Sequence, residues 1–130
     1  MRHKVLVVED DFGVRESLAD VLSDAGYEVA CAADGIEALA LLRADPQPPQ
    51  LILLDWMMPR CDGAQVMAAL QADGALADIP VVLLTADVRL QSRAAAFGVR
   101  GFLKKPVELA HLLREVGRHA RPPDPATRAV

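Results

Sequence analysis

The sequence predicts a doubly wound α/β domain, a five-stranded parallel sheet with five helices packed on its two faces. Three short aliphatic runs, Val5–Val8, Leu51–Leu54 and Val81–Leu84, contain no polar alternation. Such runs predict strands buried on both faces, which is typical of a parallel sheet covered by helices. Apolar residues at helical spacing separate these runs, and 130 residues with 52% apolar content provide enough material for one such domain.

The first half of the chain follows this alternation. After the first strand, apolar residues at helical spacing predict a helix that ends at Gly26. Residues 27–32 alternate weakly and predict a short strand, and Asp34 is placed to cap the helix that follows. The predicted inward face of that helix consists of Ile36, Leu39 and Leu42.

The second half repeats the pattern. A helix is expected from about Gly63 to Gln71, and another from Asp87 to Phe97, although Ala94–Ala96 offers little bulk to bury. Gly101–Leu103 is the predicted fifth strand. The last predicted helix is amphipathic and carries Leu109, Leu112, Leu113 and Val116.

Composition excludes several classes of protein. The net charge of −4 and the absence of a basic cluster argue against a nucleic-acid surface. No apolar run approaches the roughly 20 residues that span a bilayer, and the first residues lack the features of a secretory signal. Cys31 and Cys61 lie far apart and show no metal-binding spacing, so we expect reduced thiols in a cytoplasmic protein. We expect the folded domain to cover residues 1–121 and a proline-rich tail or linker stub to cover 122–130.

Charged and polar residues follow the predicted strands. Glu9 and Asp10 follow the first strand, Asp55 the third, Thr85 the fourth and Lys105 the fifth. Because parallel strands end at the same edge of a sheet, these side chains should converge. Carboxylates are ligands that Mg²⁺ prefers, while a hydroxyl and an ammonium suit an incoming phosphoryl group. Asp55 alone would also fit a turn cap, but the whole set predicts a carboxylate that accepts a phosphoryl group with metal assistance.

These residues resemble the motifs of one family, the receiver domains of two-component response regulators. The similar segments are Val7–Asp11, Asp55–Pro59 with Asp62–Gly63, Thr85–Ala86 and Lys105–Pro106. They occur in the family's order, and the resemblance extends to about residue 121. It implies a flavodoxin-like fold with strand order 2-1-3-4-5.

The resemblance also implies an acceptor and a metal site. Asp55 would be the phospho-acceptor and a metal ligand, and Asp10 would bind Mg²⁺ directly. Glu9 would hold a metal-bound water, and Met57 would offer its backbone carbonyl to the metal. Asp11 fits either a helix cap or a further ligand.

Three further residues receive roles from the resemblance. Thr85 and Lys105 would contact the phosphoryl oxygens, and the Lys105–Pro106 bond is typically cis in the family. Phe102 stands at the aromatic switch position, where it would respond to movement of Thr85.

The function implied is a signalling module that takes a phosphoryl group from a sensor histidine kinase or a histidine phosphotransfer protein. An aspartate-nucleophile phosphohydrolase would carry a second acid where this chain has Met57, and a flavin carrier would not place Glu9–Asp11 in its phosphate loop. Output would pass to a downstream protein target or a fused output domain, with a phosphorylation-dependent homodimer possible. We expect no direct contact with nucleic acid or membrane. Whether the chain is a complete single-domain regulator or a fragment stays open.

Overall fold

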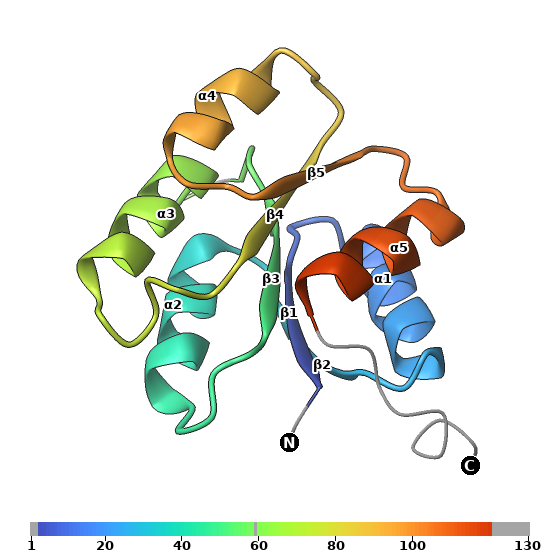
Figure 1. The fold of residues 1–130 in the computed structure, drawn as a ribbon, viewed down its shortest axis with the longest axis horizontal. Helices are drawn as coiled ribbons and strands as arrows, with labels where there is room; N and C mark the ends of the chain where they lie inside the picture. The colour runs from blue at the N-terminus through green and yellow to red at the C-terminus, as the bar shows by residue number, and fades with distance from the viewer. Residues whose placement is uncertain (1–2, 59, 121–130) are drawn as a thin grey trace.

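A computed structural model describes residues 3–58 and 60–120 of the chain. Strands and helices alternate along the whole described length (Figure 1). The elements are β1 (Lys4–Val8), α1 (Phe12–Asp24), β2 (Glu28–Ala32), α2 (Gly35–Ala44), β3 (Leu51–Asp55), α3 (Gly63–Ala72), β4 (Val81–Thr85), α4 (Leu90–Ala96), β5 (Gly101–Lys104) and α5 (Leu109–His119).

The five strands form one parallel sheet in the order β2-β1-β3-β4-β5, so the predicted fold and strand order are confirmed. The central strand, β3, pairs with β1 on one side and β4 on the other. Its last residue, Asp55, lies opposite Leu84, one residue before the end of β4. The strand ends therefore meet at one edge, as the sequence predicts.

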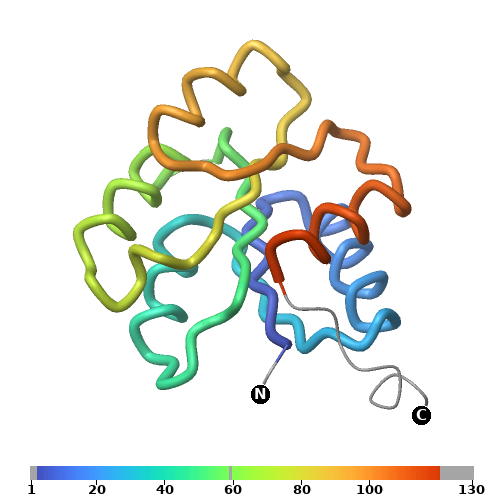
Figure 2. Tube along the Cα trace, in the orientation of Figure 1, coloured from blue at the N-terminus to red at the C-terminus, as the bar shows by residue number. Residues whose placement is uncertain are grey.

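Both faces of the sheet are covered by helices. Figure 1 shows α2, α3 and α4 on one side and α1 with α5 on the other. The tube in Figure 2 crosses the sheet between α1 and α2 and returns between α4 and α5. Alternate residues of the strands contribute to two separate cores; in β3, Leu53 faces α1 and α5, whereas Leu54 faces the other three helices. This double burial explains why β1, β3 and β4 are continuous aliphatic runs.

Side-chain caps fix where three of the helices begin. The Asp11 carboxylate accepts a hydrogen bond from the Val14 N–H at 2.9 Å and caps α1. Of the two roles considered for Asp11, the structure therefore shows the cap. Asp34 caps α2 as predicted, and Asp62 caps α3 in a reciprocal capping box with Gln65.

Three details of the predicted elements are wrong. Ile36 is exposed, because Ala38 and Leu42 form the buried face of α2 and Ile36 lies two residues before Ala38, about 200° around the helix. Leu109 is also exposed, since it opens α5 one turn before the first buried residue, Leu112.

The third error concerns α4, which begins at Leu90 and not at Asp87. The Asp87 N–H donates to Thr85 Oγ1 at 3.0 Å, and Asp87 Oδ1 accepts from the Arg89 N–H at 2.9 Å. These two bonds hold residues 86–89 in a turn ahead of the helix.

The predicted tail over residues 122–130 lies outside the described residues. No helix within residues 3–58 and 60–120 is long and apolar enough to cross a membrane.

The first testable prediction concerns the contact between α2 and the loop after β3. A Cβ on Gly35 would lie 2.6 Å from the Cys61 carbonyl oxygen and 2.6 Å from Val66 Cγ2, so Gly35→Ala should force the two segments apart. We expect it to lower the free energy of unfolding by about 1–3 kcal/mol, measured by urea denaturation. Gly74→Ala is the matched control, because no atom lies within 4 Å of its Cβ, and it should leave stability unchanged within about 0.5 kcal/mol. Equal losses in the two variants would contradict this explanation.

Candidate functional site

The carboxyl edge of the sheet carries an open pocket of about 480 Å³. It is lined by Glu9, Asp10, Asp11, Val14, Asp55, Met57, Thr85, Ala86, Asp87 and Lys105. These residues come from the ends of β1, β3 and β4, from the start of α1 and from the segment after β5. The sheet thus brings together residues that are up to 96 positions apart in sequence, from Glu9 to Lys105.

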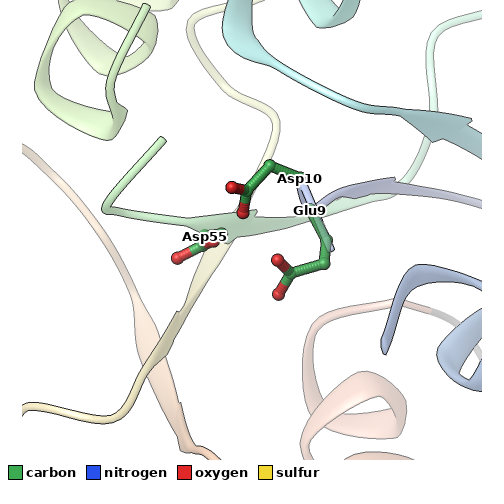
Figure 3. A group of neighbouring side chains, drawn as sticks. All are labelled: Glu9, Asp10 and Asp55. Carbon is green, nitrogen blue, oxygen red and sulfur yellow. The ribbon is translucent and has the colours of Figure 1, made fainter. Parts of the chain in front are cut away.

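Three carboxylates converge in this pocket, and Figure 3 shows Glu9 and Asp10 next to Asp55. One oxygen of each lies within 4.8 Å of the other two. Glu9 is fully buried, Asp55 is buried and Asp10 is exposed. A cation entering from solvent would therefore meet Asp10 first and the two buried carboxylates behind it.

Lys105 balances part of this negative charge. Its backbone N–H donates to the Thr85 carbonyl at 2.9 Å, which extends the pairing of β4 and β5 and brings the lysine to the pocket. Its ammonium forms an ion pair with Glu9 Oε1 and another with Asp55 Oδ2, the latter at 3.3 Å. Burial lowers the pKa of Lys105, but the Glu9 and Asp55 carboxylates outweigh it and hold the pKa above its ordinary value. The Lys105–Pro106 peptide bond is cis, as the family resemblance implies.

Asp55 is a carboxyl of the cluster whose pKa is raised. Burial, followed by the negative charge of Glu9, raises the pKa of Asp55 from 3.8 to about 7, although Lys105 opposes the shift. Burial also acts to raise the pKa of Asp10, but interactions with the Glu9 and Asp55 side chains outweigh it and lower the pKa. When the cluster holds a proton, that proton therefore resides on Asp55 rather than on Asp10.

The residues of the cluster fit Mg²⁺. All three candidate ligands are carboxylates, the hard oxygen donors that this ion prefers, and the exposure of Asp10 leaves one side accessible to water ligands. The high pKa of Asp55 also indicates a site that lacks positive charge and would gain from a cation. Met57, whose carbonyl is expected to join the ligands, lines the pocket; its N–H donates to Asp55 Oδ1 at 3.3 Å and its side chain is 70% exposed.

Thr85 lies in the pocket with its hydroxyl engaged in the loop that follows β4. The hydroxyl donates to the Asp87 carbonyl at 3.3 Å and accepts from the Asp87 N–H at 3.0 Å. The Asp87 carboxylate in turn accepts two hydrogen bonds from the Arg89 guanidinium, both at 3.0 Å. The role of Arg89 is not predicted from the sequence, although its position two residues after Asp87, typical of an aspartate turn, is the available signal.

Phe102 is not among the residues that line the pocket. It lies half-buried on β5, opposite Leu83 of β4, and packs against the core on the α2, α3 and α4 side of the sheet. Thr85 pairs with Lys104, two residues along β5 from Phe102, so the Thr85 and Phe102 side chains lie on the same face of the sheet, offset along the strands.

The sequence is similar to known response regulators. A sequence model of the response regulator receiver domain matches residues 5–117. Response regulator MprA of Mycobacterium bovis is 41% identical over 131 residues, which cover 97% of this chain and 55% of that protein. Response regulator MprA of Mycobacterium ulcerans is 43% identical over 115 residues, covering 87% of this chain and 48% of that protein. The chain thus spans about half the length of these curated relatives.

Solved structures share the fold. Chemotaxis protein CheY4 of Vibrio cholerae superposes with a TM-score of 0.84 and 32% identity, covering 92% of this chain and 99% of that chain. The receiver domain of a sensor histidine kinase from Pseudomonas aeruginosa gives a TM-score of 0.82 at 28% identity, covering 92% and 98%. That receiver domain holds a magnesium ion coordinated in its active site cleft.

The second prediction follows from the high pKa of Asp55. In the folded state this carboxyl keeps its proton up to about pH 7, whereas in the unfolded state it releases it near the ordinary pKa of 3.8. The folded state therefore binds more protons between these values, so the contribution of Asp55 to stability is fullest below about pH 4 and is lost as the pH rises to about 7. The difference in pKa sets an upper limit of about 4 kcal/mol, and we expect about 1–3 kcal/mol.

The measurement is urea denaturation in EDTA from pH 4 to 8. Wild type should lose stability relative to Asp55→Asn across this range, because the amide carries no charge to bury. Asp20→Asn removes an exposed carboxylate on α1 and should follow the wild-type curve. Parallel curves for wild type and Asp55→Asn would show that Asp55 titrates at its ordinary value.

Proposed function

The chain belongs to the response regulator receiver domains, a family whose known role is phosphorylation by histidine kinases, and we propose that Asp55 is its phospho-acceptor. The donor would be a phosphohistidine on a sensor histidine kinase or on a histidine phosphotransfer protein. The chain would act as a signalling domain that assists its own phosphorylation and dephosphorylation. The signal would pass to a downstream protein, to a fused output domain or through a phosphorylation-dependent homodimer.

One observation carries this proposal: the pocket holds a nucleophilic carboxylate, two further carboxylates, a hydroxyl and an ammonium together. Asp55 ends the central strand, β3. Glu9 and Asp10 follow β1 on one side of it, whereas Thr85 ends β4 and Lys105 follows β5 on the other side. Each group has a distinct task in moving a phosphoryl group. Acceptor, cation ligands and donors to phosphoryl oxygens are all present.

The chemistry begins with ionised Asp55. One of its oxygens would form the bond to phosphorus while the bond between phosphorus and the donor imidazole breaks. Asp10, Asp55 and the Met57 carbonyl would hold Mg²⁺ directly and Glu9 would hold it through a water; the ion would supply positive charge that favours ionised Asp55 and neutralises phosphoryl oxygens. Lys105, already 3.3 Å from Asp55 Oδ2, would exchange part of its pairing with Glu9 and Asp55 for a phosphoryl oxygen.

Thr85 would provide the first part of the switch. To donate to a phosphoryl oxygen, its hydroxyl has to leave the Asp87 carbonyl, a hydrogen bond that is already long at 3.3 Å. The movement would leave space beside β4 that Phe102, half-buried on β5, fills by rotating inward. A surface over α4, β5 and α5 would then favour one of two states, by a differential affinity of a few kcal/mol at most.

The third prediction tests the acceptor. Asp55→Asn should abolish phosphorylation by a small phosphodonor in Mg²⁺, because the amide is not a nucleophile, while the fold should survive the nearly isosteric exchange. Intact-mass analysis measures the phosphate. Asp11→Asn is the control, since it changes another aspartate of the pocket and an asparagine can still cap α1; it should remain phosphorylated. Undiminished phosphate on Asp55→Asn would place the acceptor elsewhere.

The lifetime of phosphorylated Asp55 should depend on the residues at the mouth of the pocket. Met57 lines the pocket with an exposed, apolar and flexible side chain that offers no hydrogen bond to an attacking water. On the other flank, the Asp87 carboxylate is occupied by Arg89. Neither side chain is therefore placed to orient a water in line with the bond to be broken.

The fourth prediction is that Met57→Asn shortens this lifetime, because the amide can orient the water. One hydrogen bond gained in the transition state is worth about 1 kcal/mol, so the rate should rise by at most about tenfold. The measurement is the decay of phosphorylated protein in excess Mg²⁺. Met57→Leu keeps an apolar side chain of similar size and should decay like wild type; equal or slower decay of Met57→Asn would contradict the idea.

A further inference from the structure

Trp56, the single tryptophan of the sequence, follows directly after Asp55 and is buried, with 7% exposure. Its ring lies against the first residue of α3, Gly63. A Cβ on Gly63 would meet the Trp56 ring at 2.4 Å, and the Gly63 N–H donates to the Trp56 carbonyl at 3.0 Å. Both the backbone and the ring of Trp56 therefore contact the start of α3.

Trp56 is also tied to the acceptor carboxylate. The Met57 N–H, which belongs to the peptide unit that begins with the Trp56 carbonyl, donates to Asp55 Oδ1 at 3.3 Å. A metal ion or a phosphoryl group on Asp55 would compete for this oxygen. This hydrogen bond thus links the backbone around Trp56 to the acceptor carboxylate.

On its other side, Trp56 contacts the end of α4. The rings of Trp56 and Phe97 lie 5.6 Å apart at an interplanar angle of 60°, a favourable tilted arrangement. Gln71 of α3 donates from Nε2 to the Phe97 carbonyl at 2.5 Å. The next residue, Gly98, has a φ of 95°, and a Cβ there would lie 2.6 Å from Gln71 Nε2. We refer to Trp56, Phe97 and Gln71 as the aromatic clamp.

Helix α4 has few other attachments. Of its seven residues, all of which the structure describes, only Ala94 is buried. Arg89, its N-cap residue, makes no side-chain capping bond within the described part of the chain. Leu90 is partly buried against the core. The clamp therefore acts together with Ala94 and with the buried Val99 that follows the helix in holding its C-terminal end against the core.

We propose that the aromatic clamp is a second coupling route from the phosphorylation pocket to α4, separate from Thr85 and Phe102. Occupation of Asp55 disturbs its bond with the Met57 N–H, Trp56 moves with that backbone, and Phe97 carries the movement to the C-terminal end of α4. Thr85 acts instead on the loop that enters the N-terminal end of the helix. The inference rests on the proposed function of the pocket, and Trp56 and Phe97 are positioning residues in it.

The experiment compares amide NMR spectra of the full chain before and after adding beryllofluoride with Mg²⁺. The variants are Phe97→Ala, Phe97→Leu, Thr85→Ala and, as a matched control, Phe12→Ala, which removes an exposed ring at the start of α1. In wild type and Phe12→Ala we expect shift changes at residues 94–98 as well as around Phe102. In Phe97→Ala the changes at residues 94–98 should fall to less than half, while those around Phe102 persist; Thr85→Ala should show the opposite pattern.

Trp56 fluorescence tests whether the effect of Phe97→Ala arises after Trp56 in the proposed route and not at the pocket. Beryllofluoride with Mg²⁺ should change the emission in wild type and also in Phe97→Ala, because Trp56 adjoins Asp55 in both. Phe97→Leu keeps apolar bulk without the ring and should give an intermediate NMR response, which preserves the test if Phe97→Ala does not fold. A full response at residues 94–98 in either Phe97 variant, or loss of that response in Thr85→Ala, overturns the separate route while leaving the proposed function intact. If wild type gives neither NMR nor fluorescence changes, the proposed function fails and the inference fails with it.

Discussion

Repulsion among the carboxylates at the end of the sheet is the constraint on which the rest of the site depends. Glu9 and Asp55 are buried beside each other, with Asp10 in reach of both and Lys105 as the one ammonium that pairs with them among the described residues. A pKa of about 7 for Asp55 shows that this lysine does not fully compensate the burial and the charge of Glu9. Stability is thus lost at the site, and in the proposed function a cation and a phosphoryl group would offset this loss on binding.

The sequence predicted the convergence of this site because topology alone produces it. Aliphatic runs without alternation require a sheet covered on both faces, and a parallel sheet delivers every strand end to one edge. Residues placed immediately after such runs, such as Asp55 and Thr85, were therefore located correctly without knowledge of the helices. The roles of Asp34 as a helix cap and Gly26 as a helix end were similarly predictable, since both depend on neighbours close in sequence.

The features that the sequence did not predict depend on contacts distant in sequence or on competition within a loop. Ile36 has the hydrophobicity of a core residue, but the small Ala38 faces the core because α2 packs closely on its neighbours. The start of α4 moved to Leu90 because Asp87 bonds with Thr85 and Arg89 rather than capping a helix. The contact of Trp56 with Phe97 spans 41 positions, and neither residue belongs to a periodic pattern that would have indicated it.

These loops also explain why α4, rather than the sheet, would carry a signal. Strands β1, β3 and β4 are buried along their length and β3 is paired on both sides, so a change at Asp55 has little room to move them. Helix α4 is short, with a single buried residue, and both of its ends connect to the pocket. The turn from Thr85 to Arg89 leads into one end, and Trp56 holds the other through Phe97. In the proposed switch, these two contacts would act at opposite ends of one weakly anchored helix, so that a small change in the pocket would become a displacement of the whole element.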